Sequence, residues 1–134
     1  MTSLPQTICV VDDDESVRDS MRALLESYGI AVEEYSSGRD FLSRPSSGPY
    51  ACMLLDLHMP EMDGLQLLVT MRKQGSSLPV IIVTGRGDAQ VSSRALQAGA
   101  YALLNKPVDD EVLLENIRCA AASASAKSQT GAAY

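Results

Sequence analysis

The sequence has very few aromatic residues: it contains no tryptophan and one phenylalanine, and aromatic residues make up 4% of its 134 positions. Its hydrophobic fraction is nevertheless 46%. The core is therefore expected to consist of aliphatic side chains, which suits a sheet covered by helices. The length is that of one domain.

Positive charge is also in short supply, with 11 lysines and arginines against 17 acidic residues and a net charge of −6. This balance argues against non-specific binding to nucleic acid or to anionic lipid, both of which need a basic surface. No apolar run approaches the roughly 18 residues of a membrane span. Residues 1–6 lack the basic and apolar regions of a signal peptide. We therefore expect a cytoplasmic protein that does not contact nucleic acid or membranes through this domain.

Closely spaced cysteines are absent, because Cys9, Cys52 and Cys119 are far apart and show no metal-ligand spacing. Cys9 and Cys52 lie inside apolar runs. We interpret them as buried, reduced thiols rather than as metal ligands or disulfide partners.

Short apolar runs alternate with segments of helical periodicity along the chain. Such alternation, with short loops, predicts a parallel α/β sheet with right-handed crossovers and helices on both faces. From residue 121 onward the chain is rich in alanine and serine, so we expect a domain over 1–120 and a tail or linker over 121–134, or an extension of the last helix. The expected strands are 7–11, 30–35, 50–55, 79–83 and 101–104, and the expected helices are about 16–28, a short one from about 38, about 64–74, about 89–98, and one from about 109.

Polar residues stand where four of these strands end: Asp12 and Asp13, Asp56, Thr84 and Lys106. In an open parallel sheet, ligands bind at the carboxyl ends of the strands. Neighbouring carboxylates repel each other, and a divalent cation relieves the repulsion; an all-oxygen ligand set indicates Mg²⁺. A lysine and a hydroxyl beside the metal suit phosphoryl transfer onto an aspartate.

Four motifs now carry a resemblance to a known family: VVDDD (10–14), LLDLHMPEMDG (54–64), VIIVTGRGD (80–88) and LNKP (104–107). Over about residues 7–120 the chain resembles a response-regulator receiver domain of bacterial two-component signalling. It is most similar to the receivers that precede helix-turn-helix output domains. The resemblance implies a flavodoxin-like (βα)5 fold with strand order 2-1-3-4-5.

The resemblance also implies a metal site and a phosphorylation site. Asp56 matches the phosphoacceptor. Asp13 and Asp56 match direct Mg²⁺ ligands, Asp12 matches an acid that acts through water, and the backbone carbonyl of His58 completes the set.

Other positions match the groups that respond to phosphorylation. Thr84 matches the hydroxyl that bonds the phosphoryl group and moves on activation, and Gly85 permits close approach of the backbone to the phosphate. Lys106 matches the lysine that pairs with the phosphate, and Lys106–Pro107 matches a peptide bond that is typically cis. The implied donor is a phosphohistidine on a sensor histidine kinase. The implied output is a face formed by the helix at 89–98, the strand at 101–104 and the last helix, which would form a homodimer or contact an output domain.

Two positions depart from the family pattern. Leu103 stands where receivers usually carry an aromatic residue, and Tyr101 precedes it by two residues, on the same face of the expected strand. His58 follows the phosphoacceptor by two positions, and we expect its side chain to modulate the lifetime of the acyl phosphate.

Two other functions are weighed against this one. A Mg²⁺-dependent phosphohydrolase with an aspartyl nucleophile would need a second acid two residues after Asp56, where His58 stands. An interaction module that is never phosphorylated would not need Asp12, Asp13, Thr84 or Lys106. We therefore expect a signalling phosphoacceptor that catalyses only its own phosphorylation and dephosphorylation.

Overall fold

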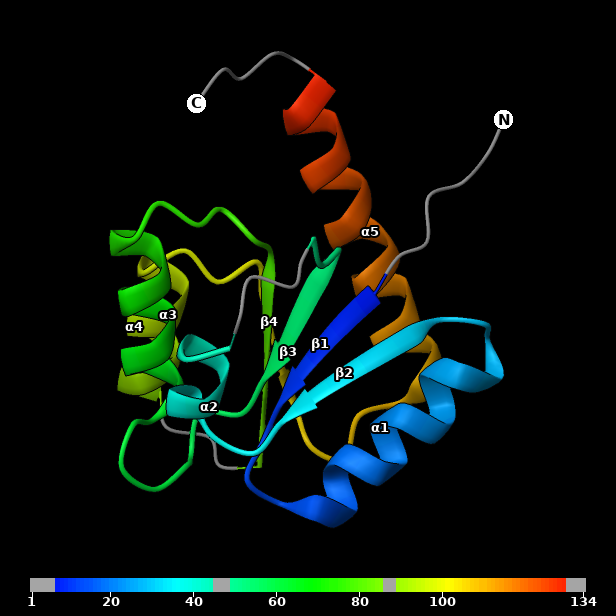
Figure 1. Cartoon of the computed structure of the whole chain (residues 1–134), viewed down its shortest axis with the longest axis horizontal. Helices are drawn as coiled ribbons and strands as arrows, with labels where there is room; N and C mark the ends of the chain where they lie inside the picture. The colour runs from blue at the N-terminus through cyan, green and yellow to red at the C-terminus, as the bar shows by residue number, and fades with distance from the viewer. Residues whose placement is uncertain (1–6, 45–48, 86–88, 130–134) are drawn as a thin grey trace.

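Five strands and five helices alternate in the computed structural model, which describes residues 7–44, 49–85 and 89–129, the last six by their backbone alone (Figure 1). The strands are β1 (Thr7–Val11), β2 (Ala31–Tyr35), β3 (Cys52–Leu55), β4 (Val80–Thr84) and β5 (Ala102–Asn105). The helices are α1 (Glu15–Ser27), α2 (Gly38–Leu42), α3 (Gly64–Lys73), α4 (Ala89–Gln97) and α5 (Asp110–Gln129).

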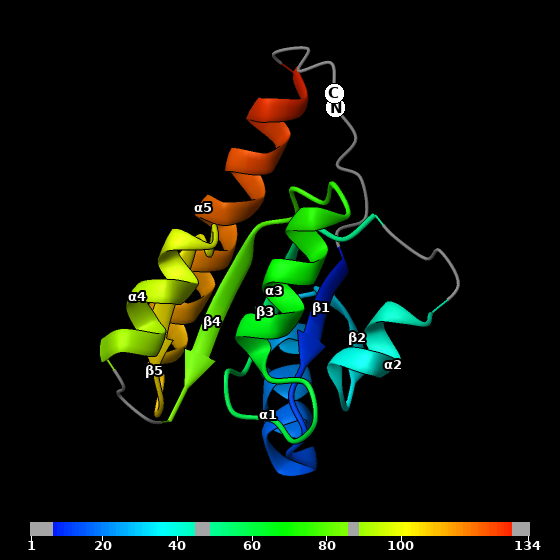
Figure 2. The same ribbon diagram turned by 90° about the vertical axis from the view of Figure 1, so that its left-hand side faces the viewer.

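The strands form one parallel sheet in the order β2-β1-β3-β4-β5, which confirms the predicted topology. Helices α1 and α5 cover one face, and α2, α3 and α4 cover the other (Figures 1 and 2). Val11 is level with Leu55, and Leu55 is level with Ile82. Strands β1 and β3 therefore end level at the carboxyl edge of the sheet, and β4 continues two residues further, to Thr84.

The central strands are buried on both faces, so their side chains divide between two aliphatic cores. Full burial of a leucine or valine side chain stabilises the fold by roughly 1.5–3 kcal/mol. The core beneath α2, α3 and α4 includes Val11, Leu55 and Ile82, and the core beneath α1 and α5 includes Val10, Leu54 and Ile81.

Cys9 and Cys52 contribute to opposite cores, and both thiols are free and buried, as predicted. Burial raises the pKa of Cys52 to about 12 and also raises the pKa of Cys9. Both thiols are therefore protonated at neutral pH and behave as small apolar side chains.

Side-chain caps fix the starts of α1 and α3. The Asp14 carboxylate accepts a hydrogen bond from the Ser16 backbone N–H, so Asp14 caps α1. Asp63 and Gln66 form a reciprocal capping box at the start of α3. Several strand bounds differ from the prediction by one or two residues: β2 begins at Ala31 rather than at residue 30, and β3 begins at Cys52 rather than at residue 50. Strands β4 and β5 each begin and end one residue later than expected.

The last helix continues well past residue 120. α5 ends at Gln129, so the alanine- and serine-rich segment is helical up to that residue. Alanine has the highest helix propensity, which accounts for the extension without an apolar stripe. The division into a domain over 1–120 and a separate tail stays a prediction. No helix in the described part of the chain is both long and apolar enough to span a membrane.

A chain of ion pairs fastens α1 to the edge strand β2. The Arg18 Nε atom lies 3.2 Å from Glu34 Oε1, and Arg22 donates a short hydrogen bond to the other Glu34 oxygen. Arg22 also pairs with Glu26, 2.7 Å away on α1. The hydrogen bond from Arg22 is the main reason why the pKa of Glu34 lies below its ordinary value, while partial burial acts in the other direction.

We predict that Glu34→Gln lowers the free energy of unfolding by about 1 kcal/mol at neutral pH, since it removes charge-assisted hydrogen bonds to two arginines. A lowered pKa in the folded state means that this stabilisation is complete above the ordinary value of 4.5 and is lost as the pH falls through the folded value. Denaturant unfolding of both proteins across this pH range tests the prediction.

The matched control is Glu26→Gln. The Glu26 side chain is 51% exposed, and in the described contacts it pairs only with Arg22. This substitution should cost no more than about 0.5 kcal/mol. A gap between wild type and Glu34→Gln that stays constant down to acidic pH would contradict the proposed ionic origin.

Candidate functional site

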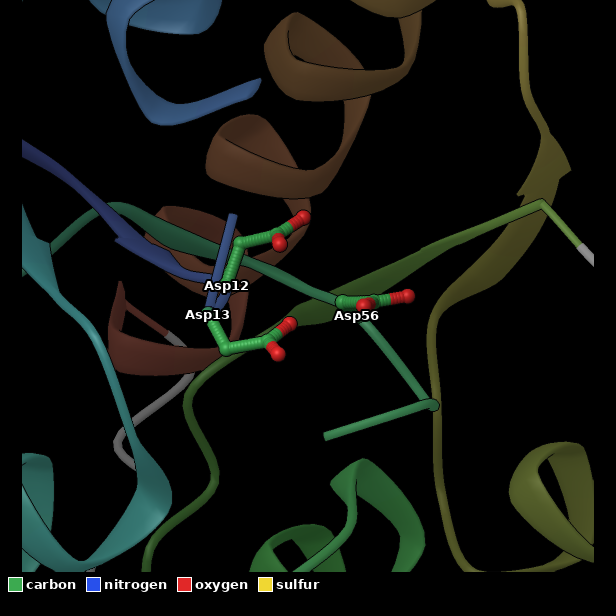
Figure 3. A group of neighbouring side chains, drawn as sticks. All are labelled: Asp12, Asp13 and Asp56. Atoms are coloured by element: carbon green, nitrogen blue, oxygen red, sulfur yellow. The ribbon is translucent and has the colours of Figure 1, made fainter. Parts of the chain in front are cut away.

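Three carboxylates gather at the carboxyl edge of the sheet. Asp12 and Asp13 follow β1 directly, and Asp56 follows β3 (Figure 3). One carboxylate oxygen from each lies within 4.8 Å of the others. The cluster forms because β1 and β3 are neighbours that end level with each other.

The three aspartates differ in burial. Asp12 is 4% exposed and Asp56 is 7% exposed, whereas Asp13 is exposed. Burial is the main reason why the pKa of Asp56 is raised, and the negative charge of Asp12 raises it further. The positive charge of Lys106 and a hydrogen bond from the backbone of His58 lower the pKa of Asp56, but they do not cancel the increase. The positive charge of Lys106 therefore does not offset the negative charge of the three carboxylates.

Lys106 lies across the two buried carboxylates. Its Nζ atom is 3.2 Å from Asp12 Oδ2 and 3.9 Å from Asp56 Oδ1. Its backbone N–H donates a 2.8 Å hydrogen bond to the carbonyl of Thr84, the fully buried last residue of β4. The Lys106–Pro107 peptide bond is cis, the isomer that the sequence resemblance implies. Thr84 and Lys106 thus stand at the same edge as the acidic cluster.

The loop after β3 returns tightly onto the strand end that carries Asp56. The Gly64 backbone N–H donates to the Leu57 carbonyl at 3.0 Å. A Cβ atom at Gly64 would lie 2.3 Å from the Asp56 carbonyl oxygen and 2.9 Å from the Leu57 Cα atom. Glycine is required here because any side chain would collide with the backbone of the site. Sequence reasoning missed this contact; the signal was a glycine in the first turn of a helix, where it lowers helix propensity.

The donor set fits a hard divalent cation. Three carboxylates supply oxygen ligands of the kind that Mg²⁺ takes, and too few to exclude water or a phosphate oxygen. The pKa of Asp56 is raised by burial first and by the negative charge of Asp12 second, and a bound cation would offset that charge. His58 lies in the loop beyond Asp56 with its side chain exposed; the role of its carbonyl stays a prediction.

Tyr101 is not brought to this edge. Its backbone N–H donates to the carbonyl of Val80, the first residue of β4, whereas Thr84 is the last. Tyr101 therefore stands at the opposite edge of the sheet, 41% exposed and just outside β5. Leu103 lies within β5 and packs against the core beneath α4. The parts expected for both residues in a switch stay predictions.

Gly85 follows Thr84, and a Cβ atom there would make an ordinary contact, 3.8 Å from the Lys106 Cδ atom. Among the described residues there is therefore room for a Cβ atom at Gly85, and the contact of Gly85 with a phosphate stays a prediction. The remaining part of this motif, residues 86–88, lies outside the described residues.

Comparison with known families gives one extended match. A model of the response regulator receiver domain family matches residues 8–118 of the chain. This range includes all the residues assigned to the candidate site.

Individual proteins agree with this match. The chain is 38% identical to the transcriptional regulatory protein TdiR of Thauera aromatica over 121 residues, which is 90% of this chain and 53% of TdiR. It is also 38% identical to the transcriptional regulatory protein FixJ of Azorhizobium caulinodans, over 87% of this chain and 54% of FixJ. The chain thus spans about half the length of these curated relatives.

Solved structures share the fold. A CheY-like response regulator receiver domain protein from Methanospirillum hungatei superposes with a TM-score of 0.85 at 32% identity. The superposition covers 93% of this chain and 99% of that one.

We predict that Gly64→Ala lowers the free energy of unfolding by about 3 kcal/mol, because the added methyl group meets backbone rather than a side chain that can move away. Chemical denaturation measures the change. Gly85→Ala is the control, since its Cβ atom has space, and it should change stability by less than about 0.5 kcal/mol. Equal stability of the two variants would contradict the close approach of Gly64 to Asp56.

Proposed function

The chain belongs to the response regulator receiver domain family, and from this we propose that Asp56 accepts a phosphoryl group from a phosphohistidine of a sensor kinase. The observation that carries the proposal is the acidic cluster opposed by one lysine at the edge of the sheet. Family membership alone does not select the acceptor. Asp12 is also buried beside Lys106, but both of its carboxylate oxygens accept hydrogen bonds, from the Asp14 N–H and from Lys106. Asp56 is selected because it is buried, lies 3.9 Å from Lys106 and has a raised pKa.

The transfer forms one bond and breaks another. A carboxylate oxygen of Asp56 attacks phosphorus, a P–O bond forms, and the P–N bond to the donor imidazole breaks. Lys106, which already contacts Asp56, would pair with the transferred group and offset its charge.

A divalent cation, Mg²⁺ by the chemistry of the donors, completes the site. Asp13 and Asp56 would bind it directly, Asp12 would act through water, and the backbone carbonyl of His58 would complete the protein ligands. When bound, the cation neutralises charge on the carboxylates and on the phosphoryl oxygens. The domain has no separate substrate in this proposal, since it catalyses only its own phosphorylation and dephosphorylation.

The signal would leave through Thr84 and the face formed by α4, β5 and α5. Thr84 would move to bond the phosphoryl oxygen, and phosphorylation would favour one of two states of that face. Leu96 on α4 is 50% exposed, and Tyr101 beside β5 is 41% exposed. These apolar side chains support its use as a contact surface for a second copy or for an output domain.

The partners follow from the same reasoning. The kinase would bind near α1 and the loop after β5, where Lys106 leads into α5. The relatives are named as transcriptional regulatory proteins, and we propose that this domain controls transcription through a further part of its own polypeptide. A cytoplasmic location fits such a role and stays a prediction.

The rival functions have less support. A phosphohydrolase would need an acid where His58 stands, and the family match does not favour it. An unphosphorylated interaction module leaves the raised pKa of Asp56 and the position of Lys106 without a use.

We predict that acetyl phosphate labels the wild-type domain only in the presence of Mg²⁺ and that Asp56→Asn abolishes the labelling, because the amide is not a nucleophile for phosphorus. Intact-protein mass spectrometry detects the added phosphoryl group. Asp14→Asn is the control: it changes the same charge in the same region but alters only the cap of α1, so it should remain labelled. Labelling that survives Asp56→Asn would overturn the assignment.

We also predict that His58→Ala changes the half-life of the acyl phosphate by at least about twofold, since the imidazole is exposed and lies two residues from the acceptor, where it would act on the attacking water. Decay of the labelled protein, followed by mass spectrometry after removal of acetyl phosphate, gives the half-life. Glu61→Ala alters another exposed residue of the same loop and should leave the half-life unchanged. Equal half-lives in wild type and His58→Ala would remove the side chain from the mechanism.

A further inference from the structure

Arg18 reaches from α1 to the backbone of the acidic cluster. Its Nη1 atom donates a 2.7 Å hydrogen bond to the carbonyl oxygen of Asp12. On another edge of the same guanidinium, Nε donates to Glu34 Oε1 at 3.2 Å. The Arg18 side chain is only 15% exposed. Two hydrogen bonds from one planar group fix the orientation of the guanidinium. Arg18 therefore links the Asp12 carbonyl to Glu34, a residue of β2.

Every other polar group of Asp12 is held as well. Its backbone N–H donates to the Tyr35 carbonyl at 3.2 Å. One carboxylate oxygen accepts from the Asp14 N–H at 2.9 Å, and the other accepts from Lys106 at 3.2 Å. Arg18 supplies the bond to the carbonyl oxygen, and it is the only one of these contacts made by a side chain of α1.

The Asp12 carbonyl matters because of the residue that follows. A peptide group is planar, so the orientation of the Asp12 carbonyl also fixes the N–H and the Cα atom of Asp13. Asp13 lies beyond the end of β1 and is exposed, so burial does not hold its carboxylate as it holds those of Asp12 and Asp56. The direction in which Asp13 presents its carboxylate therefore depends on this peptide plane.

We propose that Arg18, anchored by Glu34, is a positioning residue that orients Asp13 for binding a divalent cation. The inference rests on the proposed function, in which Asp13 is a direct ligand. Arg18 itself does not contact the cation; it acts through the Asp12 carbonyl. The ion pairs between α1 and β2 then serve the site as well as the stability of the fold.

Charge and positioning predict opposite effects when Arg18 is removed. Arg18 is positive and lies near the site, so on Coulomb grounds its loss would strengthen the binding of a cation. If Arg18 orients Asp13, its loss would weaken binding instead. The sign of the change in Mg²⁺ affinity therefore separates the two effects.

The chain offers a matched control in Arg22. Arg22 also donates to Glu34 from α1, and its removal changes the net charge by the same amount. Its described hydrogen bonds go to Glu34 and Glu26, not to Asp12. Arg18→Met and Arg22→Met thus both disturb the network with Glu34, and only Arg18→Met releases the Asp12 carbonyl.

The test is titration of the unphosphorylated domain with Mg²⁺ alone, measured by calorimetry. We expect Arg18→Met to raise the dissociation constant about tenfold, the size of effect typical for a residue that orients a metal ligand. Arg22→Met should stay within about twofold of wild type. Affinity that is unchanged or stronger in Arg18→Met, or an equal loss in both variants, would overturn the proposal.

A second measurement needs no metal. In the metal-free domain, Arg18→Met should shift or broaden the amide NMR signals of Asp13 and Asp14, and Arg22→Met should not. Unchanged signals in Arg18→Met would overturn the proposal even if the affinity changed. If the wild type binds no Mg²⁺, the proposed metal site fails, and the metal-free signals alone decide whether Arg18 orders Asp13.

Arg18→Lys is a second, milder variant that can be tested if Arg18→Met does not fold. Lysine retains the charge but cannot bond Glu34 and the Asp12 carbonyl from two edges of one rigid group. Its Mg²⁺ affinity should fall between those of wild type and Arg18→Met. An affinity equal to that of the wild type, with unchanged Asp13 and Asp14 signals, would reduce Arg18 to a structural residue.

Discussion

Two carboxylates are buried at the tip of an otherwise apolar sheet, with a single lysine between them, and the other features of the site depend on this. Burial and the charge of Asp12 raise the pKa of Asp56. An acid whose pKa is raised by folding holds its proton more tightly in the folded state, so ionisation of Asp56 lowers stability as the pH rises above the ordinary value of 3.8. At neutral pH the domain therefore carries a charge that favours the binding of a cation or a change of state.

The fold tolerates this charge because each charged group of the site is held in place by a different strand. Lys106 comes from the end of β5, Asp12 from β1, and Asp56 from β3, whose loop is held down by Gly64. The level ends of β1 and β3 place Asp12 beside Asp56, and the two aliphatic cores fix the strands that carry them. Arg18 adds a tie from α1. The precision of the site thus comes from packing far from it, as expected where a charged cluster has little apolar contact of its own.

Much of the fold and of the site could be predicted from the sequence, because the signals are apolar periodicity and polar residues at the ends of strands. Apolar runs of β-branched residues predicted β1 with both of its bounds, and polar residues at the strand ends predicted which side chains would meet. Contacts between a side chain and a backbone carbonyl leave no such pattern, so the bond from Arg18 to Asp12 was not foreseen. Nor was the left-handed backbone of Glu61, with φ of 68°, since non-glycine residues rarely adopt it. Tyr101 was expected inside the fifth strand, but β5 begins one residue later, at Ala102.

The replacement of the usual aromatic by Leu103 bears on how a change at Asp56 reaches β5. Leu103 lies opposite Ile82 in the middle of the β4–β5 pair and packs into the core beneath α4. Its side chain has no polar group that could form a hydrogen bond when the site around Asp56 changes. The backbone supplies another route. Thr84 pairs with Asn105, and its carbonyl accepts the Lys106 N–H at 2.8 Å. A displacement of Thr84 would therefore pull on the end of β5 directly and, through it, on the start of α5. Because that route uses main-chain hydrogen bonds, it does not depend on the side chain at position 103, and a leucine there is compatible with a working switch.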